Sequence, residues 1–208
     1  MILYPICLKL DNMTCCVIGG GSVALRKVRS LLKSSDKIMV ISPDLCPQLK
    51  KLYKKKAFEY QKAEYKRKLI KNAFLIIAAT NDQKVNTQIV QDANKMGKLI
   101  NVVDVPRQCN FYLPAVVNKK GILLSISTQG AFPGLAKKIR QAAAVMIKKY
   151  ADNVRILTKL RDAIKIKYKD KKIKKKLINA LLDDRILELI SNKEIGNLDQ
   201  LTAYLNIL

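Results

Sequence analysis

The 208-residue sequence contains no histidine and no tryptophan. Without histidine, a Ser-His-Asp triad, an imidazole metal site and histidine acid–base chemistry are all excluded. Any proton transfer must therefore use a carboxylate, lysine, tyrosine, cysteine or water. Aromatic residues make up only 6% of the chain, and none is interleaved with the lysine runs. The stacking platforms that bind single-stranded nucleic acid are therefore not indicated.

Long apolar runs are also missing. No run of about 18 apolar residues occurs, which argues against a membrane-spanning helix. Residues 1–10 lack the basic segment, the long apolar segment and the small-residue cleavage site of a secretory signal. The five cysteines are odd in number and show no C-x-x-C spacing, so we expect free thiols. These features predict a cytoplasmic protein without membrane association.

Acidic residues are scarce: 16 Asp and Glu face 40 Lys and Arg, which gives a formal net charge of +24. Such a surplus is compatible with nucleic-acid binding or with a solvated lysine-rich surface. It would also raise the local concentration of a small polyanionic substrate. Because 49% of the residues are hydrophobic, the chain is predicted to be globular rather than disordered.

Short apolar segments alternate with helical patterns over the first 104 residues. Strands are expected at 13–18, 37–41, 58–60, 73–79 and 99–103, and helices at 22–32, 46–55, 65–71 and 83–96. Strands that are apolar without alternation are buried on both faces, as in a parallel sheet covered by helices. The predicted fold class is therefore α/β, with an N-terminal Rossmann-like parallel sheet.

The pattern changes after residue 104. Two strands at 113–117 and 122–126, joined by a turn, precede a long helix at 131–150, and the remaining chain has helical patterns throughout. We expect three domains: a Rossmann-like domain at 1–112, a small α+β domain at 113–150 and an all-helical domain at 151–208.

A glycine-rich turn, Gly19-Gly20-Gly21, stands between the first strand and the first helix and fits the pattern G-x-G-x-x-A. Gly19 would permit the tight turn, Gly21 would let the backbone approach a pyrophosphate, and Ala24 would allow close packing of helix on strand. The helix N-terminus would offer free N–H groups to the phosphates. A flexible turn is the alternative, but this context favours a dinucleotide site.

Polar residues follow two further strands. Pro43 and Asp44 end the second strand, where Asp44 could reach a ribose hydroxyl or cap the next helix. The lack of an arginine for a 2′-phosphate favours NAD over NADP. Thr80, Asn81 and Asp82 end the fourth strand, at the edge where open α/β sheets bind ligands. They could contact the ribose or nicotinamide, and Asn81 or Asp82 could cap the following helix.

Asp104 leaves the fifth strand at the same edge. A carboxylate close to a nicotinamide is a natural base in a chain without histidine, so Asp104 is the candidate for proton transfer. The alternative is an aspartate that merely forms a turn before Pro106.

Four strings of the sequence resemble one family: CVIGGGSVALRK, AATNDQKVN, NVVDVPRQCNFYLPAVV and LLSISTQGAFPGLAKKIR. Together they are similar to precorrin-2 dehydrogenase, the NAD-dependent module of siroheme synthases, which often acts as a sirohydrochlorin ferrochelatase as well. The resemblance covers roughly residues 1–150, and the pair N-V-V-D-x-P and S-x-S-T-x-G-x-x-P is its most specific part.

The resemblance implies oxidation of precorrin-2 to sirohydrochlorin, with hydride passing to NAD⁺. Asp104 matches the essential carboxylate of the family, which in bifunctional members would also be a transient ligand for Fe²⁺ or Co²⁺. Ser22 and Val23, with Pro43 and Asp44, match positions that contact NAD. Residues 113–150 match a dimerisation domain, so a homodimer is implied.

A tetrapyrrole substrate carries many carboxylates. Ser127 and Thr128 would lie beside its cleft, and Asn110 and Lys137 are further candidates for binding it. The alternative for Lys137, a solvated helix face, is favoured for any single lysine. Alternatives are another NAD-dependent dehydrogenase of a small polyanionic substrate, or a non-catalytic protein that senses NAD or binds nucleic acid.

Overall fold

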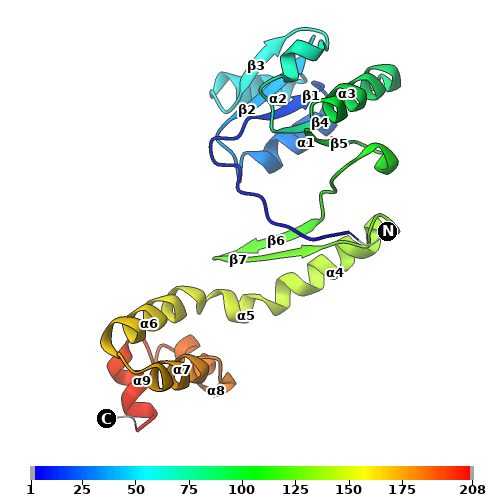
Figure 1. Ribbon diagram of the computed structural model, residues 1–208. Helices are drawn as coiled ribbons and strands as arrows, with labels where there is room; N and C mark the ends of the chain where they lie inside the picture. Colours follow the sequence, from blue (N-terminus) through cyan, green and yellow to red (C-terminus); the bar gives the residue numbers. More distant parts are fainter. Residues whose placement is uncertain (1–2, 207–208) are drawn as a thin grey trace. The chain divides into compact units, whose positions relative to one another are not determined.

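The computed structural model describes residues 3–206 (Figure 1). The chain divides into two compact units, Met1–Leu113 and Pro114–Leu208. Each unit has its own core, and each is described by itself. Within residues 3–206, no helix combines the length and the apolar character that crossing a membrane requires.

The first unit is built on five parallel strands in the order β3-β2-β1-β4-β5. The strands are β1 (Cys15–Ile18), β2 (Ile38–Ser42), β3 (Glu59–Lys62), β4 (Leu75–Ala78) and β5 (Leu99–Val102). In register, Val17 of β1 lies beside Val40 of β2 and Ile77 of β4. The chain winds outward in both directions from β1, so the predicted Rossmann-like sheet is confirmed.

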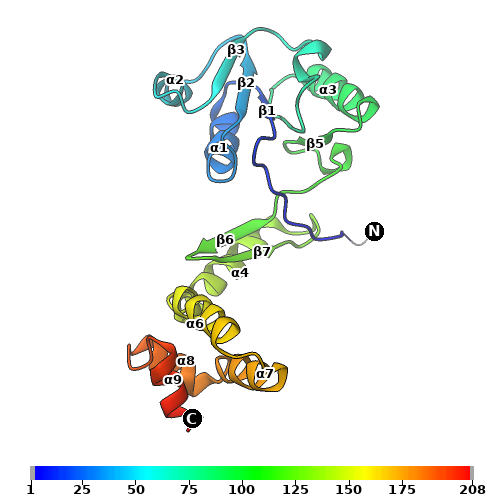
Figure 2. The same ribbon diagram turned by 60° about the vertical axis from the view of Figure 1, so that its left-hand side comes forward.

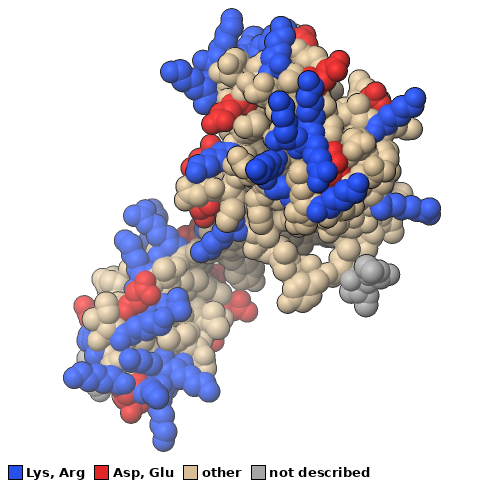
Figure 3. All heavy atoms as spheres, turned by 45° about the horizontal axis from the view of Figure 1, so that its top comes forward, with Lys and Arg blue, Asp and Glu red and all other residues tan. Residues whose placement is uncertain are grey.

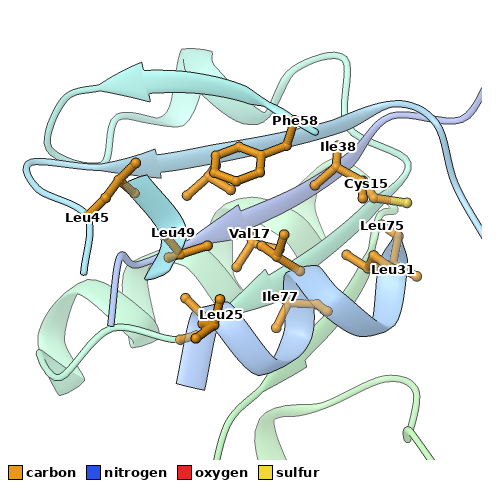
Figure 4. Packing of buried hydrophobic residues seen from close by; sticks show 14 of the residues in the cluster. Cys15, Val17, Leu25, Leu31, Ile38, Leu45, Leu49, Phe58, Leu75 and Ile77 are labelled. Atoms are coloured by element: carbon orange, nitrogen blue, oxygen red, sulfur yellow. The ribbon is translucent and has the colours of Figure 1, made fainter. Parts of the chain in front are cut away.

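Helices cover both faces of this sheet (Figures 1 and 2). They are α1 (Ser22–Leu31), α2 (Pro47–Lys54) and α3 (Gln83–Lys95), with 3-10 turns η1 (Arg67–Ile70) and η2 (Pro106–Gln108). On one face, Leu25 of α1 and Leu49 of α2 pack against Val17 and Ile77 (Figure 4). On the other face, Ile89 of α3 packs with the remaining strand residues. The apolar strands are therefore buried on both sides, as the sequence predicted.

Two local predictions in this unit were imprecise. The helix expected at 65–71 is only the 3-10 turn η1, and the strand expected at 58–60 is β3, which begins at Glu59. Phe58 is buried but lies just outside the strand. Because β3 pairs with β2 alone, its sequence is not the continuous apolar run that marks a central strand.

The second unit begins with an antiparallel hairpin of β6 (Ala115–Lys119) and β7 (Ile122–Ile126). Its two turn residues, Lys120 and Gly121, both have positive φ angles, as the commonest two-residue hairpin turn requires. The single helix predicted at 131–150 is two helices, α4 (Pro133–Met146) and α5 (Lys148–Ala151). Ile147, the residue between them, is buried.

Four helices complete the second unit: α6 (Val154–Lys167), α7 (Lys171–Ala180), α8 (Asp184–Ser191) and α9 (Leu198–Tyr204). They share a core that includes Leu160, Leu177 and Leu201. Asn153, just before α6, is buried, and its side-chain amide donates to the Leu187 carbonyl (3.0 Å). The predicted helical C-terminal region is therefore confirmed.

Candidate cofactor and catalytic site

Gly19 is the residue at which the chain leaves β1. Its φ is +124°, and a Cβ there would lie 2.2 Å from the carbonyl oxygen of Ala79. Its N–H donates to the carbonyl of Ile41 (2.9 Å). A side chain is therefore excluded both by conformation and by space, and the turn fits between the ends of β2 and β4.

Gly20 joins this turn to the loop after β2. A Cβ at Gly20 would lie 1.8 Å from the carbonyl oxygen of Asp44, and the Cys46 N–H donates to the Gly20 carbonyl (2.8 Å). The Ser42 hydroxyl donates to the same Asp44 oxygen (2.7 Å). No distinct role for Gly20 could be predicted from the sequence, because its close approach to Asp44 involves a segment more than 20 positions away.

Gly21, unlike Gly19 and Gly20, has open space where a side chain would stand. It is the N-cap of α1, and a Cβ there would meet nothing within 4 Å. No side chain caps α1 and its first turn carries no acidic residue. Ser22 is exposed and Val23 is half-buried, whereas Ala24 is fully buried against the sheet. The open helix N-terminus fits the pyrophosphate of a dinucleotide.

Asp44 is exposed at the carboxyl end of β2, next to exposed Pro43. One of its carboxylate oxygens lies 2.8 Å from Nζ of Lys50. The hydrogen bond from Lys50, followed by one from the Leu45 backbone, lowers the pKa of Asp44 below its ordinary value. The prediction that Asp44 caps α2 is wrong, because Cys46 is the N-cap and no side chain caps that helix. The ribose contact stays a prediction.

The turn after β4 is held by its own side chains. Asp82 caps α3 by accepting from the N–H groups of Lys84 (2.8 Å) and Val85 (3.2 Å), which confirms the capping alternative. The Thr80 hydroxyl donates to Oδ1 of Asn86 (2.7 Å). Asn86 is buried, and the sequence did not indicate its part in this turn. Asn81 is exposed at the tip of this turn, and its contact with a cofactor stays a prediction.

Asp104 lies just beyond β5, at the same edge of the sheet as the glycine turn. Its φ is +61°, in the left-handed region that costs most side chains about 1–2 kcal/mol and that aspartate tolerates better than most. The residue is exposed, and its carboxylate has no hydrogen-bond partner among residues 3–206. Backbone strain of this kind is concentrated at functional sites, and the free carboxylate is available to a ligand.

Lys27 is a neighbour of this carboxylate that the sequence did not single out. It is half-buried on α1, and burial is the main cause that lowers the pKa of its ammonium group. The negative charge of Asp104 opposes this lowering of the Lys27 pKa. A helix pattern alone could not show which loop faces Lys27.

Asn110 follows Asp104 in a segment that runs along the outer side of β5. Its Oδ1 accepts from the N–H of Ile100 (2.8 Å), and its Nδ2 donates to the carbonyl of Lys98 (2.8 Å). The Cys109 sulfur accepts from the N–H of Val102 (3.1 Å). The side-chain amide of Asn110 is thus engaged with the backbone, and its binding of substrate stays a prediction.

The remaining substrate candidates belong to the second unit. The Ser127 hydroxyl accepts from the Gln129 N–H (3.0 Å), and the Thr128 hydroxyl accepts from the Phe132 N–H (3.1 Å). Both side chains therefore shape the loop that enters α4. Lys137 is exposed on α4. Their contacts with a substrate stay predictions.

No group of three or more Cys, Asp or Glu side chains suited to a resident metal occurs in the described part of the chain. Metal contact by Asp104 during chelation stays a prediction.

Residues 6–115 match the model of an NAD(P)-binding family. This match covers the parallel sheet, the glycine turn and Asp104. The chain belongs to this NAD(P)-binding family. The predicted dinucleotide-binding domain is thereby confirmed, while the choice between NAD and NADP is not decided by it.

The chain is similar to siroheme synthases. The siroheme synthase of Chromobacterium violaceum is 31% identical over 193 residues, covering 92% of this chain and 41% of that protein. The one of Nitrosococcus oceani is 37% identical over 147 residues, covering 71% of this chain and 31% of that protein. The chain thus spans less than half the length of these relatives.

A solved structure, that of "SirC, precorrin-2 dehydrogenase", superposes on the chain with a TM-score of 0.81. It is 26% identical, and the match covers 97% of this chain and 100% of that one. The resemblance to the precorrin-2 dehydrogenase family, stated from four sequence strings, is confirmed.

Proposed function

We propose that the chain oxidises precorrin-2 to sirohydrochlorin, with NAD⁺ as the hydride acceptor and Asp104 as the base. One observation carries the proposal: the exposed carboxylate of Asp104, a residue with a positive φ, and the open N-terminus of α1 at Gly21 share the carboxyl edge of one sheet. Asp104 follows β5 and Gly19 follows β1, two strands apart in the sheet order. At the usual strand spacing this separation is about 10 Å, which suits a dinucleotide lying across the edge.

The reaction removes two hydrogens from the tetrapyrrole. Bound NAD⁺ supplies the hydride acceptor. The second hydrogen leaves as a proton, which Asp104 takes as a general base. The open N-terminus of α1 would hold the pyrophosphate. The surplus of basic side chains, visible over the surface in Figure 3, attracts a substrate that carries many carboxylates.

A homodimer is part of the proposal. Val116, Asn118, Leu123 and Ser125 share the face of the hairpin that does not pack on α4, and all four are exposed. A two-stranded sheet is marginally stable alone, and Val116 and Leu123 leave apolar surface on it. A second copy of the chain would cover this face. Sedimentation analysis that gave a monomer at micromolar concentration would contradict it.

The test is an anaerobic assay with precorrin-2 and NAD⁺, in which NADH and the tetrapyrrole spectrum are followed. Asp104→Asn keeps the side-chain shape and the tolerance for a positive φ, but removes the base. We expect its turnover to fall by about 100-fold or more, with NADH affinity unchanged within about twofold. Asp36→Asn is the matched control, since Asp36 is an exposed acid before β2, at the opposite edge.

Near-normal turnover of Asp104→Asn would remove Asp104 from the mechanism. Addition of Fe²⁺ or Co²⁺ after the oxidation tests ferrochelation, in which Asp104 would be a transient ligand. A panel of other small polyanionic substrates tests the alternative dehydrogenase. Steeply salt-dependent DNA binding without NADH production would instead favour a nucleic-acid-binding protein.

A further inference from the structure

Asp44, at the end of β2, is paired with Lys50, and Lys62 follows on the neighbouring strand. Nζ of Lys50, one turn into α2, lies 2.8 Å from the Asp44 carboxylate. The loop that carries Asp44 is fixed: Gly20 packs on the Asp44 carbonyl, and the Ser42 hydroxyl donates to the same oxygen. The Asp44–Lys50 pair is therefore presented beside the glycine turn rather than on a free loop.

Lys62 lies at the end of β3, the strand beside β2. It pairs in register with Ser42, and side chains alternate along a strand, so it shares a face with Tyr60. The Tyr60 hydroxyl donates to the carbonyls of Ser42 (3.0 Å) and Pro43 (3.3 Å), which brings this face onto the loop. The charge of Lys62 contributes to the lowered pKa of Asp44. Two ammonium groups thus accompany one carboxylate.

The balance of charge at this position decides which adenosine ribose is accepted. A lone carboxylate accepts hydrogen bonds from ribose hydroxyls and repels a 2′-phosphate. A phosphate group carries about −1.5 to −2 charges at pH 7 and three strong acceptor oxygens. Two ammonium groups can hold it, provided that they also compensate the charge of the carboxylate.

The ion pair can rearrange without being broken. The side chains of Lys50 and Asp44 are 54% and 76% exposed, and exposed pairs of this kind contribute little to stability. The Lys50 ammonium has three N–H donors, so it can donate to a phosphate while another N–H stays on Asp44 and compensates its charge. Lysine also acts as a mobile point charge, unlike the rigid fork of arginine.

We propose that Lys50, assisted by Lys62, forms a binding site for a ribose 2′-phosphate, so that the chain binds NADP(H) as well as NAD(H). Asp44 retains the contact with an unmodified ribose, and Lys50 sets the ratio of the two affinities. The inference rests on the cofactor part of the proposed function and not on the tetrapyrrole.

The experiment measures the dissociation constants of NADH and NADPH by nucleotide fluorescence, without tetrapyrrole, in the full chain and its variants. For Lys50→Gln we expect NADPH binding to weaken about tenfold, the effect of losing one charge-assisted hydrogen bond. NADH binding should change less than about twofold. Lys62→Gln should shift the ratio in the same direction.

Lys54→Gln is the matched control. It removes the same charge from the same helix, but Lys54 lies with Lys37 and Phe58 around a hollow at the amino end of the strands. It should leave both affinities unchanged. Gly21→Asp should abolish binding of both nucleotides, which would show that they share the site.

Equal loss of NADH and NADPH affinity in Lys50→Gln would overturn the proposal, as would wild-type protein that binds NADH but not NADPH. The proposed function fails separately: nucleotide binding with no oxidation of precorrin-2 would contradict that function and leave the Lys50 site standing.

Discussion

Replacing Gly21 by aspartate should separate cofactor binding from folding. The Cβ position of Gly21 is open, and its φ of −85° suits any residue. Aspartate is also a good N-cap residue, and it is more favourable than glycine at that position by a few tenths of a kcal/mol. The free energy of unfolding of Gly21→Asp should therefore stay equal or rise slightly.

Cofactor binding should respond in the opposite direction. Two unit charges about 4 Å apart repel by about 4 kcal/mol at an effective dielectric constant near 20. A difference of about 1.4 kcal/mol is a factor of ten in affinity. An aspartate beside the pyrophosphate should therefore weaken NADH binding by about 100-fold or more.

Gly20→Ala is the contrasting variant. Its Cβ would lie 1.8 Å from the Asp44 carbonyl oxygen, a backbone atom that cannot rotate away. Overpacking of this kind costs about 1–3 kcal/mol or more. Urea unfolding and NADH titration of both variants test the reasoning. Destabilised Gly21→Asp protein, or Gly21→Asp with wild-type NADH affinity, would refute it.

Three further predictions concern stability. Asp82→Ala removes the cap of α3 and should lower the free energy of unfolding by about 1 kcal/mol; an unchanged urea midpoint would contradict the capping bonds. Leu177→Ala opens a fully buried position in the helical core and should cost about 2–5 kcal/mol, measured in the same way. Burial raises the pKa of the Cys16 thiol to about 12, whereas an unfolded thiol has a pKa of about 8.5. The free energy of unfolding should therefore fall as the pH rises between these two values.

Ionisation of Cys16 favours unfolding. The thiolate forms readily only in the unfolded chain, so the stability that the neutral thiol contributes is fully present below about pH 8.5 and falls by about 1.4 kcal/mol per pH unit above it. Urea unfolding at pH 8, 9 and 10 should show a steeper loss in the wild type than in Cys16→Ala. Parallel pH dependences would show that the pKa of this thiol is not raised in the folded chain.

The sequence was sufficient for features that depend on local pattern. The apolar strands around Val17 and Ile77, the glycine turn at Gly19 and the position of Asp104 after β5 were all predicted, because burial on both faces and tight turns leave a signature in consecutive residues. The break between α4 and α5 at Ile147 could not be predicted, because neither glycine nor proline stands there.

Contacts between distant segments could not be predicted in this way. Nothing in the local pattern shows that Gly20 packs on Asp44. Because no arginine stands near Asp44 in the sequence, Lys50 and Lys62 were not predicted as partners of a 2′-phosphate. The occupied amide of Asn110 is a similar case. Each depends on which strand ends the fold brings together, and this is fixed only when the whole sheet has formed.

The backbone pairing of Asn110 also has a consequence for solubility. An unpaired outer strand is a template on which a second molecule can add its own strand, and such addition leads to fibres. The bonds from Asn110 and Cys109 occupy the outward groups of Ile100 and Val102, so this border of the sheet offers no template. The opposite border, β3, is only four residues long and carries Glu59 and Lys62, charges that oppose stacking of further chains. Both edge strands of this sheet, β5 and β3, are therefore protected against pairing with a strand of another molecule.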